Sequence, residues 1–559
     1  MARCHRFRYT NPLPLRKNEA PPVTSRRQLL AATATAIPLG LAAPGLAQAQ
    51  VFRSDLAPMA LPMKQDDTIA QGYRRDPLVR WGDRVAFDAP GWNPQGQDPE
   101  AAAGQFGWDA KVIGMAQAPT AADGVPRGVL AVIHPTVDPA MAFPRGGSAA
   151  MASAMQGASL LNIEKRGRWG VVDGGYQNRR LHRGTPVRIS GPAAEAAAGG
   201  AGGANGFSRG ILAPQGGTVT PWGTLLLAEG NPAAAVATLG AITPGSESLT
   251  QFGWLVELDP LDPRSVPVKR TAPGRMNHGD VVATLSRDGR AVIYRVNRDA
   301  DGHLVRFVSA GPATDADALD NGTLSVAVVD AQGRLSWAPV GSAGSPPAAQ
   351  QLVEMNGVAK AATPGTVFPM PSGLALDPRK PRLLMVCRGG ARRPAGFVLE
   401  VTPDGGDDAA ATGTVSTLFA AGDPQTVSAQ YGRGGLPAGS AWLENPETVA
   451  IDTRGRAWIG TDRGGAPGTQ ANGLFVVDLE GPGRGVPLPI YGAPRGASVG
   501  GAALTPDGEV VFTAVRHPGA EPGASFARPG TRWPAFEAGV PPRTTLIGIE
   551  RLAGGPVGG

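Results

Sequence analysis

Four acidic residues lie beside turns or strand-like runs, where side chains from separate segments can converge on one ion. They are Asp83, Glu229, Asp280 and Glu447. Carboxylate oxygens are hard ligands that calcium accepts in irregular geometry, so the set is a candidate calcium site. Two other interpretations stay open. Glu229 and Glu447 could pair with arginines, and Asp83, which ends the run RWGD, could accept backbone N–H bonds within a turn.

Three histidines and one tryptophan are candidates for lining a substrate channel. They are His134, His278, His517 and Trp222, the last of which lies in the turn TPWGT (220–224). Histidine can donate, accept or ligate a metal near neutral pH. A single histidine is more often a hydrogen-bonded structural residue, and a tryptophan is more often a packed ring, so a structural role stays open for all four.

Several common catalytic motifs are missing from the sequence. It has no G-x-S-x-G nucleophile elbow, no phosphate-binding loop and no Cys/His spacing typical of zinc. Its two cysteines are Cys4 and Cys387. Cys387 lies in the apolar run LLMVC, which favours a buried and inert thiol. If Cys4 is removed with a leader, an internal disulfide is excluded.

Residues 1–50 have the pattern of an export signal. The adjacent Arg26 and Arg27 precede a moderately apolar run from Leu29 to Leu46, and Ala47-Gln48-Ala49 forms a small-x-small cleavage pattern. Paired arginines in this setting are typical of a twin-arginine (Tat) signal. Prolines inside the run make it a poor membrane span. We therefore expect the Tat machinery as a partner and a periplasmic or secreted protein, with residues 51–559 as its single folded domain.

The excess of positive charge belongs to the leader. Residues 1–50 hold seven of the 52 Lys and Arg residues and one of the 46 Asp and Glu residues, so residues 51–559 carry 45 of each. A balanced charge gives no support for binding to nucleic acid or to an anionic membrane.

Short apolar runs joined by Asp/Gly turns recur along the chain. Examples are GVLAVIH (128–134), AVIYRV (291–296), ETVAIDTRGRAWIGT (447–461) and GAALTPDGEVVFTAV (501–515). Asp and Gly supply the local hydrogen bond and the positive φ that tight hairpins need. Repeated hairpins over this length favour a β-propeller with loop insertions, since the chain is long for the alternative, a β-sandwich.

A series of motifs in a fixed order resembles the PhoX-type alkaline phosphatases, which are exported β-propeller enzymes. The motifs are RWGD (80–83), QFGW (105–108), TPVRISGPAA (185–194), TPWGT (220–224), FGWLVELDPLDPRSVPVKRTAPGR (252–275), LDNGTLSVAVVDAQG (319–333), VTPDGGD (401–407), ANGLFVVDLEGPGRG (471–485), LTPDGEVVFTAVRHPG (504–519) and RWP (532–534). The resemblance implies a six-bladed propeller. It also implies a cluster of iron and calcium, held at one end of the channel by carboxylates and one cysteine, that hydrolyses phosphate monoesters.

This sequence departs from the family at most of the positions that the resemblance assigns to metal ligands. The substituted positions are Pro135, Gln215, Gly230, Gly279, Ser372 and Ser498. The cysteine falls at Gln215, or at Pro214 if the loop length differs. Glu229 is kept, and Glu447 stands where the family has aspartate. A multivalent cluster needs anionic ligands to balance its charge. We therefore expect no iron, and at most weak calcium binding on the remaining carboxylates.

Three functions remain after these substitutions. The first is an exported PhoX-like propeller that has lost the iron–calcium cluster and is non-catalytic or binds a small-molecule or phosphoester ligand. The second is an active phosphomonoesterase that uses a reduced calcium site. The third is another propeller hydrolase, such as a lactonase. The missing ligands favour the first.

Overall fold

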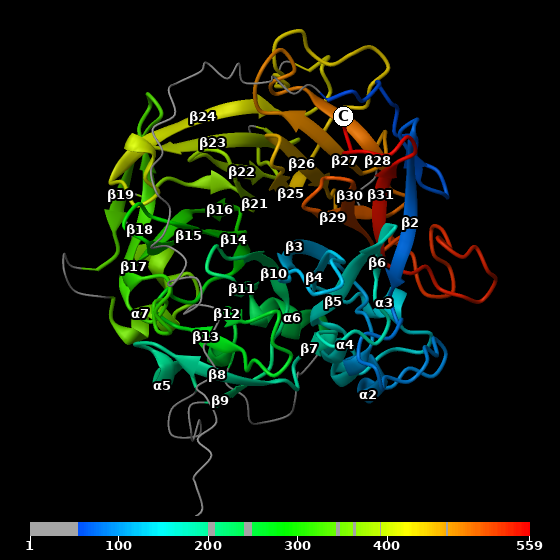
Figure 1. The fold of residues 1–559 in the computed structure, drawn as a ribbon, viewed down its shortest axis with the longest axis horizontal. Coiled ribbons are helices and arrows are strands. Elements are labelled where there is room, and N and C mark those ends of the chain that lie inside the picture. Colours follow the sequence, from blue (N-terminus) through cyan, green and yellow to red (C-terminus); the bar gives the residue numbers. More distant parts are fainter. Residues whose placement is uncertain are drawn as a thin grey trace, which may run out of the picture.

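The computed structural model describes residues 54–198, 207–239, 249–341, 347–361, 365–391, 393–426, 428–464 and 468–559. The expected leader (1–50) lies outside the described residues. Most of the described chain forms antiparallel β-strands, and the helices are short (Figure 1). No helix in the described ranges is long and apolar enough to cross a membrane.

Strand pairing forms sheets of five, six, nine, two and nine strands. Within these sheets the main strands can be followed as successive antiparallel runs of four, each of which is one unit of the fold. In order these are β3 (Lys111–Gln117), β4 (Arg127–His134), β5 (Gly157–Arg166), β6 (Arg168–Val171); β10 (Pro214–Val219), β11 (Leu225–Glu229), β12 (Leu255–Leu258), β13 (Val268–Arg270); β14 (His278–Leu285), β15 (Arg290–Asn297), β17 (Leu304–Pro312), β18 (Gly322–Val329); β21 (Pro371–Leu376), β22 (Leu383–Cys387), β23 (Phe397–Pro403), β24 (Thr412–Ala420); β25 (Pro446–Ile451), β26 (Arg456–Thr461), β27 (Gly473–Asp478), β28 (Pro487–Gly492); and β29 (Ser498–Leu504), β30 (Val510–Arg516), β31 (Thr545–Arg551) with β2 (Tyr73–Arg80).

The remaining elements extend these units or lie in the connections between them. They are β1 (Thr68–Ile69), α2 (Pro99–Gly104), α3 (Pro139–Ala142), α4 (Ala149–Met155), β7 (Arg179–Leu181), β8 (Pro186–Ser190), α5 (Ala194–Ala197), β9 (Phe207–Arg209), α6 (Pro232–Leu239), β16 (Asp301–Gly302), β19 (Arg334–Pro339), α7 (Ala349–Val353), α8 (Gly357–Ala361) and β20 (Phe368–Pro369), with short 3-10 turns at Leu249–Gln251 and Asp404–Gly406.

The first strands of the units form a ring. Neighbouring first strands contact one another in the order β3, β10, β14, β21, β25, β29 and back to β3. Figure 1 shows them around the centre, with β18, β24 and β2 at the rim. The ring closes because β2, near the start of the described chain, pairs with β31 near its end. The mainly β propeller expected from the sequence is confirmed, and the insertions include α2 to α4.

The turns within the units use the Asp/Gly chemistry that the sequence indicates. Asp330 accepts hydrogen bonds from the backbone N–H groups of Gln332 and Arg334, and Gly333 adopts a φ of 78°. Asp452 does the same for Arg454 and Arg456. The aspartate holds the turn while glycine takes the left-handed conformation that other residues avoid.

The hydrophobic core lies between adjacent units. Val129 and Ile133 of β4 pack with Leu225 and Leu227 of β11, and all four are fully buried. Leu226 faces the other way, into the cluster that contains Ile293 of β15. Burial of each such side chain stabilises the fold by about 1.5–3 kcal/mol. Because both faces of a unit are buried in this way, the ring holds the ends of the first strands in fixed relative positions.

Candidate functional site at one end of the central ring

Four first strands contain an equivalent β-bulge at their second residue. The strand register skips one residue between Pro214 and Gly216 and does the same in three other units. The skipped residues are Gln215, Gly279, Ser372 and Glu447. A bulge residue lies outside the ladder and re-aims its side chain, here at one end of the ring. The three substituted ligand positions Gln215, Gly279 and Ser372 are therefore structurally equivalent to Glu447, which keeps the acidic charge of its position.

A second equivalent position directly follows the second strand of each unit. Its occupants are Pro135, Gly230, Arg298, Arg388, Asp462 and His517. In four units its backbone N–H donates to the carbonyl of the residue before the first strand; the donors are Gly230, Arg298, Arg388 and Asp462 and the acceptors are Ala213, Asn277, Met370 and Asn445. Pro135, Gly230 and His517 were candidates from the sequence, whereas Arg298, Arg388 and Asp462 were not. Comparing the units of this chain with one another could have found them.

Backbone strain collects at the same end of the ring. Ala213, Met370 and Asn445, which precede β10, β21 and β25, have φ values of 47°, 47° and 49°, and His517 has a φ of 34°. Non-glycine residues rarely adopt this region, and such strain clusters at functional sites. At Ala213, Met370 and Asn445 this conformation comes just before a bulged strand and helps to turn the bulge residue toward the axis.

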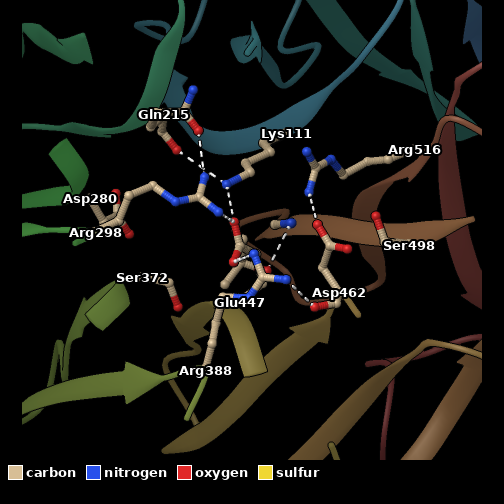
Figure 2. A network of polar contacts seen from close by, with 12 residues as sticks. Lys111, Gln215, Asp280, Arg298, Ser372, Arg388, Glu447, Asp462, Ser498 and Arg516 are labelled. Atoms are coloured by element: carbon tan, nitrogen blue, oxygen red, sulfur yellow. Dashed lines mark hydrogen bonds and ion pairs between the residues drawn. The ribbon is translucent and has the colours of Figure 1, made fainter. Parts of the chain in front are cut away.

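Glu447 lies at the centre of this end and is surrounded by cations of the protein (Figure 2). Its Oε1 is 2.6 Å from Lys111 Nζ and 3.3 Å from Arg298 Nη2, and its Oε2 is 3.1 Å from Arg388 Nη1. The carboxylate is fully buried. Burial alone would raise its pKa, but the charges of Arg298, Lys111 and Arg388 outweigh it and lower the pKa of Glu447 to about 2.

Arg516 forms the second centre of charge, between two buried aspartates. Its Nε and Nη2 contact Asp109 at 2.8 and 2.9 Å, and its Nη1 contacts Asp462 Oδ2 at 2.9 Å. Burial opposes ionisation, yet the Arg516 charge holds the pKa values of Asp109 and Asp462 well below the usual range. Arg388 Nη2 donates to the Asp462 carbonyl at 2.6 Å and so links both centres. Together the four cations and three carboxylates carry one net positive charge.

The substituted ligand positions make protein contacts of their own. Gln215 Oε1 accepts from Arg298 Nη1 at 2.6 Å, and its Nε2 donates to the Ala213 carbonyl. Ser372 Oγ donates to the Pro446 carbonyl, and Ser498 Oγ lies 3.2 Å from His517 Nε2. Each of these polar side chains is held by a neighbouring residue.

Gly279 lies where a longer side chain has no room. A Cβ there would lie 2.7 Å from the Pro371 carbonyl oxygen and 3.2 Å from Arg298 Cβ. The backbone oxygen cannot move without moving β21. A glutamate at position 279 would therefore collide with the β21 backbone and press on the base of the Arg298 side chain.

Two of the predicted calcium ligands are engaged elsewhere. Glu229 is fully buried, accepts backbone N–H bonds from Leu212, Gly253 and Trp254, and lies 3.1 Å from Lys269 Nζ. Asp83 accepts from the Arg80 backbone N–H and pairs with Arg543. The structure does not join these two carboxylates to Glu447. Asp83 accepts a turn N–H as its alternative proposed, whereas Glu229 pairs with a lysine and not with the arginine that its alternative named.

Three of the four predicted channel residues are structural and buried, and one lines a cavity. His134 and His278 are buried, and their Nδ1 atoms contact the carbonyls of Asp109 and Glu229. Burial lowers the pKa of His278 to about 3 and that of His134 well below its usual value, so both are neutral. Trp222 is a packed ring whose Nε1 donates to Glu257. By contrast, His517 lines a cavity and stacks on Trp108 with 5.9 Å between ring centroids.

Asp280 joins three first strands. Its Oδ1 accepts from the N–H groups of Gly217 on β10 and Val281 on β14, and its Oδ2 accepts from Leu374 on β21 at 3.0 Å. Burial raises the pKa of Asp280 to about 7. Adjacent first strands share few backbone hydrogen bonds, so this carboxyl group fastens neighbouring units together.

Asp280→Asn is expected to lower the free energy of unfolding by about 1–3 kcal/mol, because an amide nitrogen would face a backbone N–H that now has an acceptor. Urea denaturation measures the loss. Asp301→Asn, at an exposed position, is the matched control. Equal stability of both variants would show that Asp280 does not fasten the strands.

Two connected cavities open at this end of the ring. The larger, of about 1080 Å³, is lined by Trp108, Thr136, Arg298, Arg516 and His517 among others. The smaller, of about 310 Å³, shares Gln215 and Arg298 with it. The smaller volume lies within the range of small-molecule sites, about 300–1,000 Å³, and the larger volume lies just above it.

A closed ring of antiparallel units with a polar cluster at one end of its axis defines a β-propeller with an axial site. The family model of alkaline phosphatase PhoX matches residues 55–519, and the chain belongs to this family. The solved structure of Pseudomonas fluorescens PhoX in complex with vanadate, a transition state analogue, is similar with a TM-score of 0.80 and 25% identity, over 90% of this chain and 99% of that chain.

A glycosyl hydrolase from Bacteroides ovatus is a much weaker match, with a TM-score of 0.29 and 11% identity over 78% of this chain and 99% of that chain. No curated protein matches the sequence.

The residues at the axial site do not fit an iron–calcium cluster. Of the four bulge residues, only Glu447 is acidic, and three protein cations already contact it. Within the described ranges, no group of three or more His, Cys, Asp or Glu side chains is placed to hold a metal ion. A metal at Glu447 would have to displace Lys111, Arg298 and Arg388 or lie against their charges.

Proposed function

We propose that this chain is an exported PhoX-family propeller that binds a small anionic ligand, of the phosphate-monoester class, without hydrolysis by an iron–calcium cluster. One observation carries the proposal. The acidic residue at the centre of the site is neutralised by three cations of the protein, Lys111, Arg298 and Arg388. These groups supply positive charge at the axis, as metal ions would, but they offer no open coordination position for a water nucleophile.

The anion would bind in the larger cavity. Arg298 and Arg516 line it, and the Arg298 side chain keeps 22% of its surface exposed. The cluster beneath the cavity carries one net positive charge. The two other acidic residues of the wall are engaged, since Glu521 pairs with Arg495 and Asp138 accepts from the Ala140 backbone N–H. Guanidinium groups bind phosphate through several N–H donors in a fixed plane. His517 and Thr136 add polar groups at the same wall.

We also propose that the protein is exported through the Tat pathway. The paired Arg26 and Arg27 and the small-x-small pattern at Ala47-Gln48-Ala49 support passage through the Tat machinery to the periplasm or the exterior. The partner expected for the leader is that machinery. The partner expected for the folded domain is a phosphoester or another small anion. Calcium could at most bind weakly at the axial carboxylates, since they are already paired.

Metal content and activity test the proposal on protein purified after native export. We expect no stoichiometric iron by elemental analysis. We also expect no hydrolysis of p-nitrophenyl phosphate at alkaline pH, with or without added calcium, because Glu447 is not free to ligate. Inorganic phosphate should still bind in calorimetry. Arg298→Gln should weaken that binding about tenfold or more, since it removes a charged donor.

Arg528→Gln, at an exposed position outside both cavities, is the control for Arg298→Gln. Iron at a fixed ratio together with phosphomonoester hydrolysis would overturn the proposal. Hydrolysis that depends on added calcium alone would instead support a reduced calcium site, and lactone hydrolysis without phosphatase activity would support the third function.

A further inference from the structure

The smaller cavity is lined by carboxamide side chains. Gln156, Gln215, Asn231 and Asn277 all contribute to its wall, and Arg298 forms the boundary with the larger cavity. Among the described residues, Arg298 is the charged member of the cavity wall. Carboxamides both donate and accept hydrogen bonds, and this dual character matches hydroxyl groups.

One of these carboxamides, that of Gln156, is buried at the cavity wall with an oxygen that no described residue pairs. The residue is 2% exposed, and among the described residues its Oε1 has no hydrogen-bond partner. A buried polar atom without a partner costs free energy, and native proteins rarely leave one. Because Gln156 lines the cavity, a hydroxyl group bound there is the partner that we expect its buried carboxamide to take up.

The two asparagines supply complementary groups. Asn231 Oδ1 accepts from the Ala233 backbone N–H at the start of α6, so its Nδ2 is the group left for a ligand. Asn277 Nδ2 donates to Asp299 at 2.7 Å, so its Oδ1 is left as an acceptor. One donor, one acceptor and the Gln156 amide together suit several hydroxyl groups on one small molecule.

The position of the cavity connects it with the substituted residues. Pro135 lines it, and a Cβ at Gly230 would lie 2.8 Å from Gln215 Cγ. Gln215 therefore fills space into which a side chain at position 230 would extend. On the other side Gln215 holds Arg298, which in turn contacts Glu447 (Figure 2). Pro135, Gln215 and Gly230, which lie on this side of the site, are thus uncharged, whereas Glu447 on β25 and Arg388 after β22 form an ion pair.

We propose that the smaller cavity binds the neutral polyhydroxyl part of a sugar or polyol phosphate, whose phosphate lies against Arg298 in the larger cavity. This inference rests on the proposed function and names its ligand class. The volume of about 310 Å³ suits a group of monosaccharide size. Arg298 stands where the two cavities meet, so one ligand can use both.

Calorimetry with inorganic phosphate, glucose 6-phosphate and glucose tests this on the exported protein. Glucose 6-phosphate should bind at least tenfold more tightly than phosphate. Gln156→Leu should reduce that preference about three- to tenfold, the effect of losing one or two hydrogen bonds. The same variant should not lower the melting temperature, because Gln156 Oε1 has no partner to lose among the residues that the structure describes. Gln105→Leu, another buried amide that lines neither cavity, should leave the preference unchanged.

The possible outcomes separate this inference from the proposed function. Equal binding of phosphate and glucose 6-phosphate, unaffected by Gln156→Leu, would overturn the amide subsite and leave anion binding intact. Failure of all three probes to bind would overturn both. Glucose binding that is lost in Gln156→Leu but kept in Arg298→Gln would support the subsite and overturn its link to phosphate.

Discussion

Glu447→Gln is expected to lower the free energy of unfolding by about 3–5 kcal/mol, the cost typical of removing one partner from a buried ion pair. The change keeps the size of the side chain and removes its charge. Lys111, which is 2% exposed, would then lie beside Arg298 and Arg388 without a counter-ion. Burial already lowers the pKa of Lys111. In the variant, loss of the proton from this amine should therefore offset part of the cost of the uncompensated positive charge. Urea denaturation at neutral pH measures the loss.

The chain offers a matched control at its surface. Glu480 also contacts three cations, Lys380, Arg382 and Arg379, but 45% of its side chain is exposed. Solvent screens such pairs, so Glu480→Gln should cost no more than about 1 kcal/mol. The double variant Lys111→Met/Glu447→Gln should recover much of the stability. If Glu447→Gln is as mild as Glu480→Gln, the axial cluster does not depend on internal charge compensation.

Arg516→Met is expected to cost a similar amount, about 3–5 kcal/mol, because it leaves Asp109 and Asp462 buried without their shared cation. The loss should also depend on pH. Asp109 and Asp462 have folded-state pKa values below their unfolded values, so the stability they contribute is present above about pH 4 and is lost as the pH falls.

In the Arg516→Met variant this contribution is missing, so the difference in stability from the unmodified protein should shrink between pH 6 and about pH 3. Unfolding followed by circular dichroism across that range measures it. Arg551→Met, which removes a partly exposed pair with Asp55, is the control and should show no such convergence. A difference that stays constant with pH would indicate lost packing rather than lost charge.

The sequence was sufficient for the fold because hairpin signals are local. Asp330 with Gly333, and Asp452 with Gly455, identify turns from a few adjacent residues, and their recurrence predicts the propeller. Aligning family motifs also found bulge positions such as Gln215 and Glu447. The ion-pair partners could not be predicted in this way, since Lys111 and Glu447 are 336 positions apart.

The candidate calcium ligands show the same limit. Glu229 looked available because its partner Lys269 lies on another strand, 40 positions away. Arg298 and Arg388 follow apolar strands and resemble ordinary surface arginines until the ring brings them to its axis. The partners of these charged side chains lie on other strands or in other units. A pattern of neighbouring residues in the sequence therefore cannot identify them.

The closure of the ring by β2 and β31 has a consequence for biosynthesis. Arg74 and Glu550, which form an ion pair across this seam, are 476 positions apart. The seam cannot form until the last strand has left the ribosome, and such distant pairing folds slowly. A chain that terminates early would expose the edge of β2, which invites aggregation and proteolysis. The native ring can therefore form only after the whole chain, including β31, has been synthesised.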